Sequence, residues 1–85
     1  MFTNIVSTQQ HEFHFRKVQA LCNMRRFYTV SLQPTLFGEW SLVRRWGRVG
    51  TKGRSLLHTY ESEVRARVAL DQAVCKRRKR GYVEM

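Results

Sequence analysis

The sequence predicts an α+β fold, a small antiparallel β-sheet with one α-helix packed across it. Three observations predict this fold. Apolar and aromatic residues alternate along three segments, glycine or proline separates those segments, and one helical stripe of apolar residues follows them. The chain has 85 residues, which is enough for one compact core.

The first expected strand spans residues 26–33. Aromatic and β-branched residues are typical of strands, and alternation puts Tyr28, Val30 and Leu32 on one face. The segment Gln33-Pro34-Thr35 ends this strand, because proline cannot donate to a ladder.

Two further strands are expected at residues 39–46 and 54–60, the second pairing back on the first. Four residues of the segment 39–46 share one face: Trp40, Leu42, Arg44 and Trp46. Trp40 is assigned to the core. Between these strands lie Gly47, Gly50 and Gly53. They predict a turn region in which a positive φ carries no Cβ penalty.

A helix is expected from Ser62, as N-cap, to about Arg78, with Gly81 ending it. Its apolar stripe consists of Ala66, Ala69, Leu70, Ala73 and Val74. This spacing predicts that the stripe packs on the sheet. A second apolar strip, Val64, Val68 and Cys75, lies on the opposite side of the helix. Residues 82–83 are compatible with an added edge strand.

We expect the chain to divide into a partly ordered N-terminal lead-in, residues 1–22, and a domain of residues 23–85. Residues 11–24 leave two interpretations open. Phe13 and Phe15 alternate with polar residues, as in a short strand, whereas Val18 and Leu21 fit a helical turn equally well.

Charge is the outstanding feature of the composition. Sixteen Lys+Arg against six Asp+Glu give a net charge of +10, which attracts polyanions. Nucleic acid is the commonest such partner, followed by anionic membranes and acidic proteins, and a basic surface that only maintains solubility is the alternative. The longest uncharged segment, residues 27–38, is too short and too polar for a membrane span of about 20 apolar residues.

The two cysteines, Cys22 and Cys75, belong to no closely spaced pair, so neither a disulfide scaffold nor a zinc site is expected. No secretory start is visible in the first residues, and we expect a cytoplasmic protein, nucleoid-associated if it binds DNA. The three histidines and the scattered acids show no spacing for a triad or a metal site, so we expect no catalysis, cofactor or metal.

Residues 44–54 carry five Arg/Lys and no acid around Trp46-Gly47-Arg48. A flat aromatic ring among cations suits nucleic acid, and glycines let the backbone approach phosphate. The candidate nucleic-acid-binding residues of this run are Arg44, Arg45, Trp46, Gly47, Arg48, Lys52 and Arg54. Residues 76–80 form a second basic block, from which Lys76, Arg77, Lys79 and Arg80 are added as candidate phosphate contacts.

The segment Trp46-Gly47-Arg48-Val49-Gly50-Thr51 resembles the signature of the WGR domain. This domain occurs beside the catalytic domain of DNA-damage-responsive poly(ADP-ribose) polymerases and as small stand-alone bacterial proteins. Arg26-Phe27-Tyr28, Leu36-Phe37-Gly38 and Arg80-Gly81-Tyr82 are similar to the stand-alone form as well. The resemblance covers roughly residues 23–83.

The resemblance implies a non-catalytic module that recognises DNA ends, nicks or backbone. In the polymerases the matching Trp packs on the sugar of the terminal nucleotide at a break, beside the matching Arg, which here are Trp46 and Arg48. Stand-alone relatives commonly carry Gln where this chain has Arg54. Two alternatives stay open: an adapter domain that contacts a protein partner, and an RNA-binding module. We expect a monomer or a weak dimer.

Overall fold

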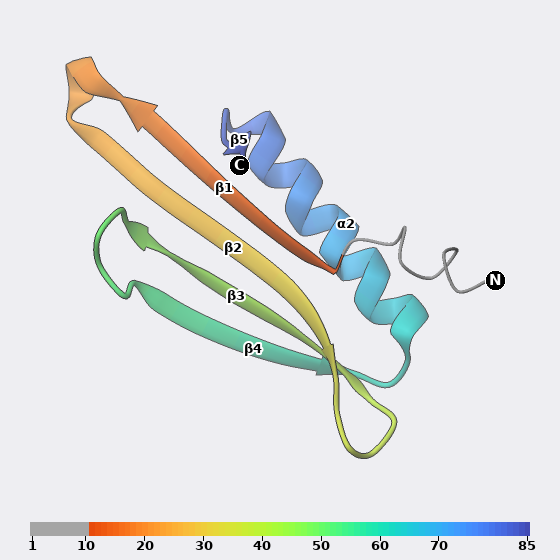
Figure 1. Ribbon diagram of the computed structural model, residues 1–85. Helices are drawn as coiled ribbons and strands as arrows, with labels where there is room; N and C mark the ends of the chain where they lie inside the picture. The colour runs from red at the N-terminus through yellow and green to blue at the C-terminus, as the bar shows by residue number, and fades with distance from the viewer. Residues whose placement is uncertain (1–10) are drawn as a thin grey trace, which may run out of the picture.

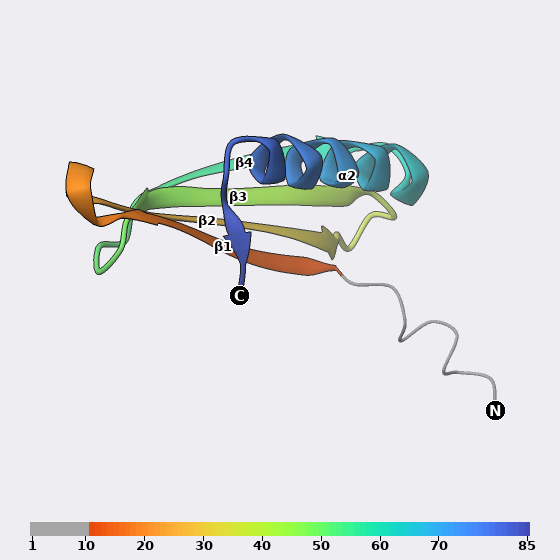
Figure 2. The same cartoon turned by 90° about the horizontal axis from the view of Figure 1, so that it is seen from above.

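A computed structural model describes residues 11–85. Its elements follow in the order β1 (Glu12–Gln19), a 3-10 helix (Ala20–Cys22), β2 (Met24–Pro34), β3 (Trp40–Arg48), β4 (Arg54–Tyr60), α2 (Glu63–Lys79) and β5 (Val83–Glu84) (Figure 1). The strands form one antiparallel sheet in the order β4-β3-β2-β1-β5. Helix α2 lies along one face of this sheet (Figure 2). The α+β fold predicted from the sequence is confirmed.

Strand β1 decides between the two interpretations of residues 11–24. It pairs with β2 along its whole length, from Glu12 opposite Ser31 to Gln19 opposite Met24. The 3-10 helix follows and ends at Asn23, which has a φ of 51°. Asparagine tolerates this left-handed conformation better than most residues. The sheet therefore includes residues that were expected to belong to the N-terminal lead-in.

The core lies between α2 and the sheet. The helix contributes the expected stripe, with Ala66, Leu70, Ala73 and Val74 buried. The sheet contributes Phe15, Tyr28, Val30, Leu32 and Leu42. Trp40 and Trp46 are half-buried and pack against this cluster. On the outer side of α2 the second strip is exposed, so only one face of the helix is used for folding.

Both ends of α2 are capped. The Arg65 amide donates to Ser62 Oγ at 3.3 Å, which confirms the expected N-cap. At the other end Gly81 has a φ of 90°, and its amide donates to the Arg78 carbonyl. The Tyr82 amide donates to the Arg77 carbonyl, which completes a Schellman motif. This motif turns the chain back toward the sheet, where β5 pairs with β1.

The glycines of the β3–β4 region differ in role. Gly50 and Gly53 have φ values of 94° and 71°, as expected for a turn. The same expectation is wrong for Gly47, which lies within β3 opposite Phe27 and has no positive φ. A Cβ on Gly47 would lie 2.7 Å from the Gly53 Cα. Gly47 is therefore required by the close approach of two backbones.

Candidate nucleic-acid interface

A groove of about 530 Å³ lies where the C-terminal end of α2 meets the ends of β2 and β3. Arg26, Trp46 and Arg48 line it from the sheet, and Arg77 and Arg80 line it from the helix. The remaining lining residues are Cys22, Asn23, Met24, Arg25, Phe27, Gly47 and Tyr82. The lining thus contains five arginines and no acid, so the electrostatic potential in the groove is positive.

Trp46 takes part in both the core and the groove. It lies opposite Tyr28 on β2 and opposite Arg54 on β4, on the face of the sheet that carries α2. Its ring is half-buried and packs against the core cluster, yet it also lines the groove. The sheet therefore holds the ring in place while part of it stays open to a ligand.

Cations face one another across three strands beside Trp46. Arg26 on β2 lies directly opposite Arg48 on β3 and also opposite Lys17 on β1. Like charges at directly opposite positions destabilise a sheet. Lys17 is engaged, because its Nζ donates to the Arg80 carbonyl at 2.6 Å. Arg26 and Arg48 are exposed, and an anion bound between them would relieve their repulsion.

The backbone of Arg48 is held firmly. The Thr51 amide and the Thr51 hydroxyl both donate to the Arg48 carbonyl, at 3.1 and 2.8 Å. The next residue, Val49, extends the ladder, since its amide donates to the Arg25 carbonyl at 2.9 Å. The base of the Arg48 side chain is thus fixed at the mouth of the β3–β4 turn.

Arg77 is positioned by aromatic rings. Its guanidinium carbon lies 4.0 Å from the centroid of the Tyr28 ring and 5.5 Å from that of Tyr82. Both distances are within the range of a cation–π interaction. Tyr28 is buried in the core, so one of the two rings that contact Arg77 is held in a fixed place beside the groove.

The other candidate residues lie around the groove or outside it. Arg44 and Lys76 line a neighbouring hollow of about 230 Å³, which they share with Arg77. Arg54 is exposed on β4 opposite Trp46, and Lys52 is exposed in the β3–β4 turn. Arg77 lines both this hollow and the groove, so Arg44 and Lys76 lie close to the groove.

Two of the candidate residues point elsewhere. Arg45 lies on the sheet face away from α2, with its Cζ 5.5 Å from the centroid of the Phe27 ring. Lys79 lines a separate hollow beside Phe13 and Asp71. The basic block 76–80 does not form one surface, because successive helical residues are turned by about 100°.

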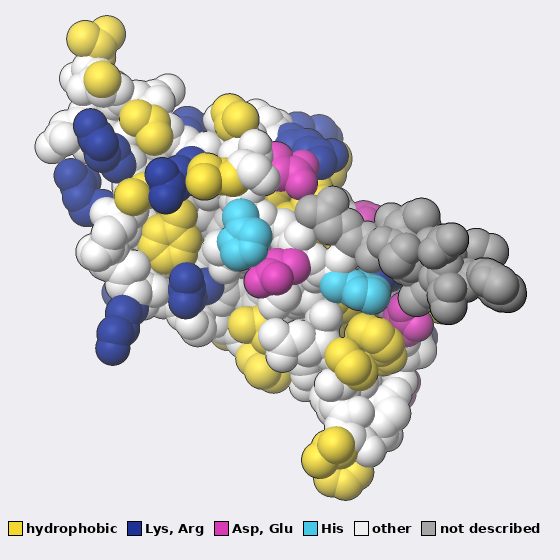
Figure 3. Space-filling model, viewed as in Figure 1, with side chains coloured by type: hydrophobic (Ala, Val, Ile, Leu, Met, Phe, Trp, Pro, Cys, Tyr) yellow, Lys and Arg dark blue, Asp and Glu magenta, His cyan; other side chains and the backbone are white. Residues whose placement is uncertain are grey.

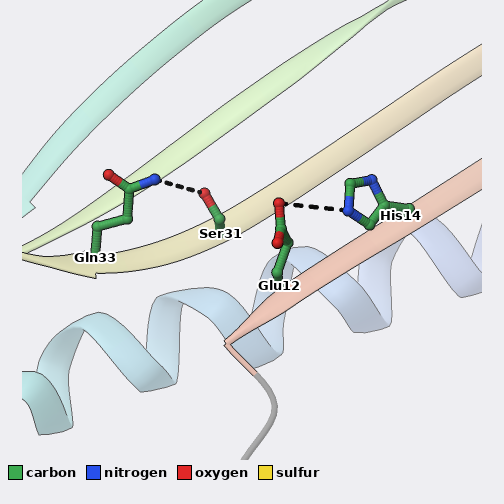
Figure 4. Close-up of polar contacts among 4 residues, drawn as sticks. All are labelled: Glu12, His14, Ser31 and Gln33. Atoms are coloured by element: carbon green, nitrogen blue, oxygen red, sulfur yellow. Dashed lines mark hydrogen bonds and ion pairs between the residues drawn. The ribbon is translucent and has the colours of Figure 1, made fainter.

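The charges of the molecule are segregated along the sheet. On the face away from α2, Lys and Arg gather over the end that carries the 3-10 helix and the β3–β4 turn (Figure 3). Toward the other end, His14 pairs with Glu12 at 3.4 Å, and Gln33 donates to Ser31 at 3.4 Å (Figure 4). The groove is on the opposite face of the sheet but at the same end, because residues next to the 3-10 helix and the β3–β4 turn line it.

The sequence candidates did not include Arg25, Arg26 and Tyr82, which line the groove, or Lys17, which lies beside it. The signal for Arg26 was present, because pairing residues 26–33 back on 39–46 through a short loop brings it close to Arg48. Lys17 and Tyr82 gave no such signal, since their places depend on β1 and on the turn after α2.

Within residues 11–85 no three His, Cys, Asp or Glu side chains come together in a way that could hold a metal ion. Cys22 and Cys75 are both exposed free thiols. Among the described helices none is long and apolar enough to cross a membrane.

The comparison with known families agrees with the geometry of the groove. The family model of the WGR domain matches residues 10–85. The chain belongs to the WGR domain family. This family is non-catalytic and in general of the nucleic-acid-binding type. In this WGR domain Trp46 and Arg48 of the signature lie on one face of β3, because they are two positions apart along the strand. Gly47 lies between them against Gly53.

Two known proteins are similar to this WGR domain. The uncharacterized protein y4dW of Sinorhizobium fredii is 37% identical over 81 residues, which are 94% of this chain and 39% of that protein. A crystal structure of a Bacteroides fragilis protein superposes with a TM-score of 0.75 at 20% identity, covering 87% of this chain and 19% of that one. The second likeness shows the fold alone. The chain spans about two-fifths of the curated relative it matches.

Proposed function

We propose that this WGR domain binds DNA at ends or nicks, without catalysis, through the groove between α2 and the sheet. In this proposal Trp46 packs on the terminal nucleotide, and Arg26 and Arg48 hold the adjacent phosphates. The observation that carries the proposal is the pair of directly opposed arginines beside a half-buried tryptophan, in a groove with no acid.

The partial burial of Trp46 favours recognition of DNA ends and nicks over recognition of intact duplex DNA. A ring that packs against the core cluster on one side offers only its remaining surface to a ligand. In an intact duplex each base is covered by its neighbours, so such a ring finds no free surface to stack on. A terminal or nicked nucleotide exposes its sugar and one base face, and stacking there contributes about 1–3 kcal/mol.

In this proposal the arginines of the groove supply the part of the DNA affinity that does not depend on an end or a nick. Arg77 and Arg80 face the groove from the helix, opposite Arg26 and Arg48 on the sheet. Guanidinium groups match phosphate oxygens in a bidentate way. Arginines on two sides of the groove can contact the phosphates of a DNA backbone that runs along it. The Trp46 ring would contact one nucleotide of that DNA.

The experiment compares two matched substrates. A covalently closed DNA dumbbell and the same dumbbell with one nick differ only in the nick. Trp46→Leu keeps an apolar group against the core and removes the flat ring, so it should weaken binding to the nicked dumbbell by about 1–3 kcal/mol, or roughly 5- to 150-fold. Binding to the closed dumbbell should change much less, because the arginines remain.

Lys79→Ala serves as the control, since Lys79 lies outside the groove. It removes one positive charge and should weaken binding to both dumbbells slightly and equally. If Trp46→Leu weakens binding to both substrates equally, end recognition by Trp46 is wrong and general backbone binding remains. Stronger binding of single-stranded RNA than of either dumbbell would favour the RNA alternative.

A further inference from the structure

The two edges of the sheet differ in how they are protected from other strands. At one edge β5 has only two residues, and the flanking strand β1 carries charged side chains at four positions: Glu12, His14 when protonated, Arg16 and Lys17. At the other edge β4 has seven residues, of which Arg54 and, when protonated, His58 are charged. Short edges and charged edges resist pairing with another chain, so β4 is the open edge.

Strand β4 also lacks the other features that block pairing. It contains no proline, and its register with β3 runs without a bulge from Trp46 opposite Arg54 to Trp40 opposite Tyr60. Its first six residues are exposed, and Leu56 and Leu57 are 51% and 60% exposed on opposite faces of the sheet. Apolar groups on both faces of an open edge strand favour addition of another strand.

The hydrogen bonding of the sheet shows which backbone groups of β4 point outward. The Val49 amide donates to the Arg25 carbonyl, and the Thr35 amide donates to the Glu39 carbonyl, so the odd-numbered positions of β3 bond to β2. Because bonding alternates along an antiparallel ladder, the even-numbered positions of β3 bond to β4. Three residues of β4 then direct their N–H and C=O groups away from the sheet: Ser55, Leu57 and Thr59.

We propose that β4 pairs antiparallel with β4 of a second copy of this chain, across a two-fold axis at Leu57. In this register Leu57 lies opposite Leu57 of the second copy, and Ser55 lies opposite Thr59. All the outward-directed backbone groups of these residues then find partners at once. Arg54 falls opposite Tyr60, so no two cations oppose each other in the new ladder.

This arrangement also tolerates the high charge of each copy. The two-fold axis stands perpendicular to the sheet, so both α2 helices lie on one face of a continuous ten-stranded sheet. The strands run antiparallel, and the cationic grooves therefore lie toward opposite ends of the dimer. The new contact consists of one strand pair and the flanking leucines, which is small for a stable interface. The dimer is weak and forms as concentration rises.

The first test is sedimentation velocity of the full chain over a range of concentrations. The unmodified chain should shift from monomer to dimer as concentration increases. Leu57→Lys places two cations opposite each other at the axis and should raise the dissociation constant at least tenfold. Val64→Lys makes the same charge change on the outer side of α2, where Val64 is 73% exposed. This control should change the dissociation constant of the dimer by no more than about twofold.

The second test needs no substitution and follows amide hydrogen exchange of β4 residue by residue. In the dimer the amides of Ser55, Leu57 and Thr59 should become slower to exchange as concentration rises, whereas those of Leu56 and His58 should be protected at every concentration. A chain that stays monomeric up to about 1 mM would overturn the proposal. So would a dimer that Leu57→Lys does not weaken, or one in which these three amides stay unprotected, because its contact would lie elsewhere.

Discussion

Arg26 on β2 and Arg48 on β3 lie directly opposite each other on the face of the sheet that carries α2. Both are exposed, and the groove that they line holds no acid. Such a pair lowers the stability of the free protein and becomes favourable when an anion binds between the two guanidinium groups. The guanidinium groups of Arg26 and Arg48 thus repel each other, and a phosphate group bound between them would relieve that repulsion.

This relationship predicts opposite effects of Arg48→Gln on folding and on binding. Removing one of the two charges should raise the free energy of unfolding by about 0.2–1 kcal/mol at low salt, the range for directly opposite pairs. The same variant should bind DNA more weakly, because a phosphate contact is lost. Urea unfolding and a DNA titration measure the two effects.

Arg16→Gln is the matched control for this prediction. Arg16 is an exposed strand arginine that lies opposite Phe27 and Val83, so no cation opposes it directly in the ladder. Its replacement should change the free energy of unfolding by no more than about 0.5 kcal/mol relative to the unmodified chain. A loss of stability in Arg48→Gln would show that the two arginines do not repel each other in the free protein.

Binding to duplex DNA should depend steeply on salt. Five arginines line the groove, and neutralising about five phosphates gives a slope of about −4 to −5 in a plot of log K against log salt concentration. Arg48→Gln should reduce the magnitude of the slope by about 1. A slope near zero would exclude a mode of binding dominated by phosphate contacts.

The packing of α2 predicts unequal costs for two neighbouring substitutions. Leu70 is fully buried, so Leu70→Ala should lower the free energy of unfolding by about 2–4 kcal/mol. Val68 is 51% exposed, and Val68→Ala should cost clearly less. Denaturant unfolding of both variants tests this, and the reverse order would mean that the helix is turned the other way.

Two glycines with similar φ angles should differ in their tolerance of a side chain. Gly38 and Gly53 have φ values of 82° and 71°, so alanine is strained at both positions. At Gly38 an added Cβ meets nothing within 4 Å, and Gly38→Ala should cost about 1–2 kcal/mol. At Gly53 the Cβ would collide with the Trp46 carbonyl and lie 2.7 Å from Phe27 Cζ, so Gly53→Ala should cost roughly 3 kcal/mol or more.

Thermal unfolding of the two alanine variants measures this difference. Gly53→Ala should also disturb DNA binding, because it displaces the backbone of Trp46. Equal destabilisation by the two substitutions would show that the β3–β4 turn can move away from β3 without cost, and the firm positioning of Trp46 would then be wrong.

The parts of the fold that depend on local pattern could be predicted from the sequence. The alternation around Tyr28 places β2 and its buried face, and the stripe around Leu70 places the buried face of α2. Ser62 is recognisable as an N-cap because a hydroxyl precedes the helical pattern. Strand β1 could not be assigned, because its apolar spacing fits two periods and pairing with β2 decides between them.

The parts that depend on three-dimensional proximity could not be predicted. The role of Gly47 comes from the approach of Gly53, which no local pattern encodes. The groove joins Arg26 to Arg80, which only the direction of α2 and the register of β2 bring together. The basic block at the end of α2 is continuous in sequence but divided in space, because the helix turns its members to different sides.

The most direct test of the central claim is to map where DNA contacts the domain, by following backbone and tryptophan indole NMR signals during titration with the nicked dumbbell. If the groove is the binding site, the largest changes will be at the Trp46 indole and at the amides of Arg48 and Arg80. If the largest changes are instead at Thr29 and Arg45, on the face of the sheet away from α2, the groove is not the DNA-binding site and the account is wrong.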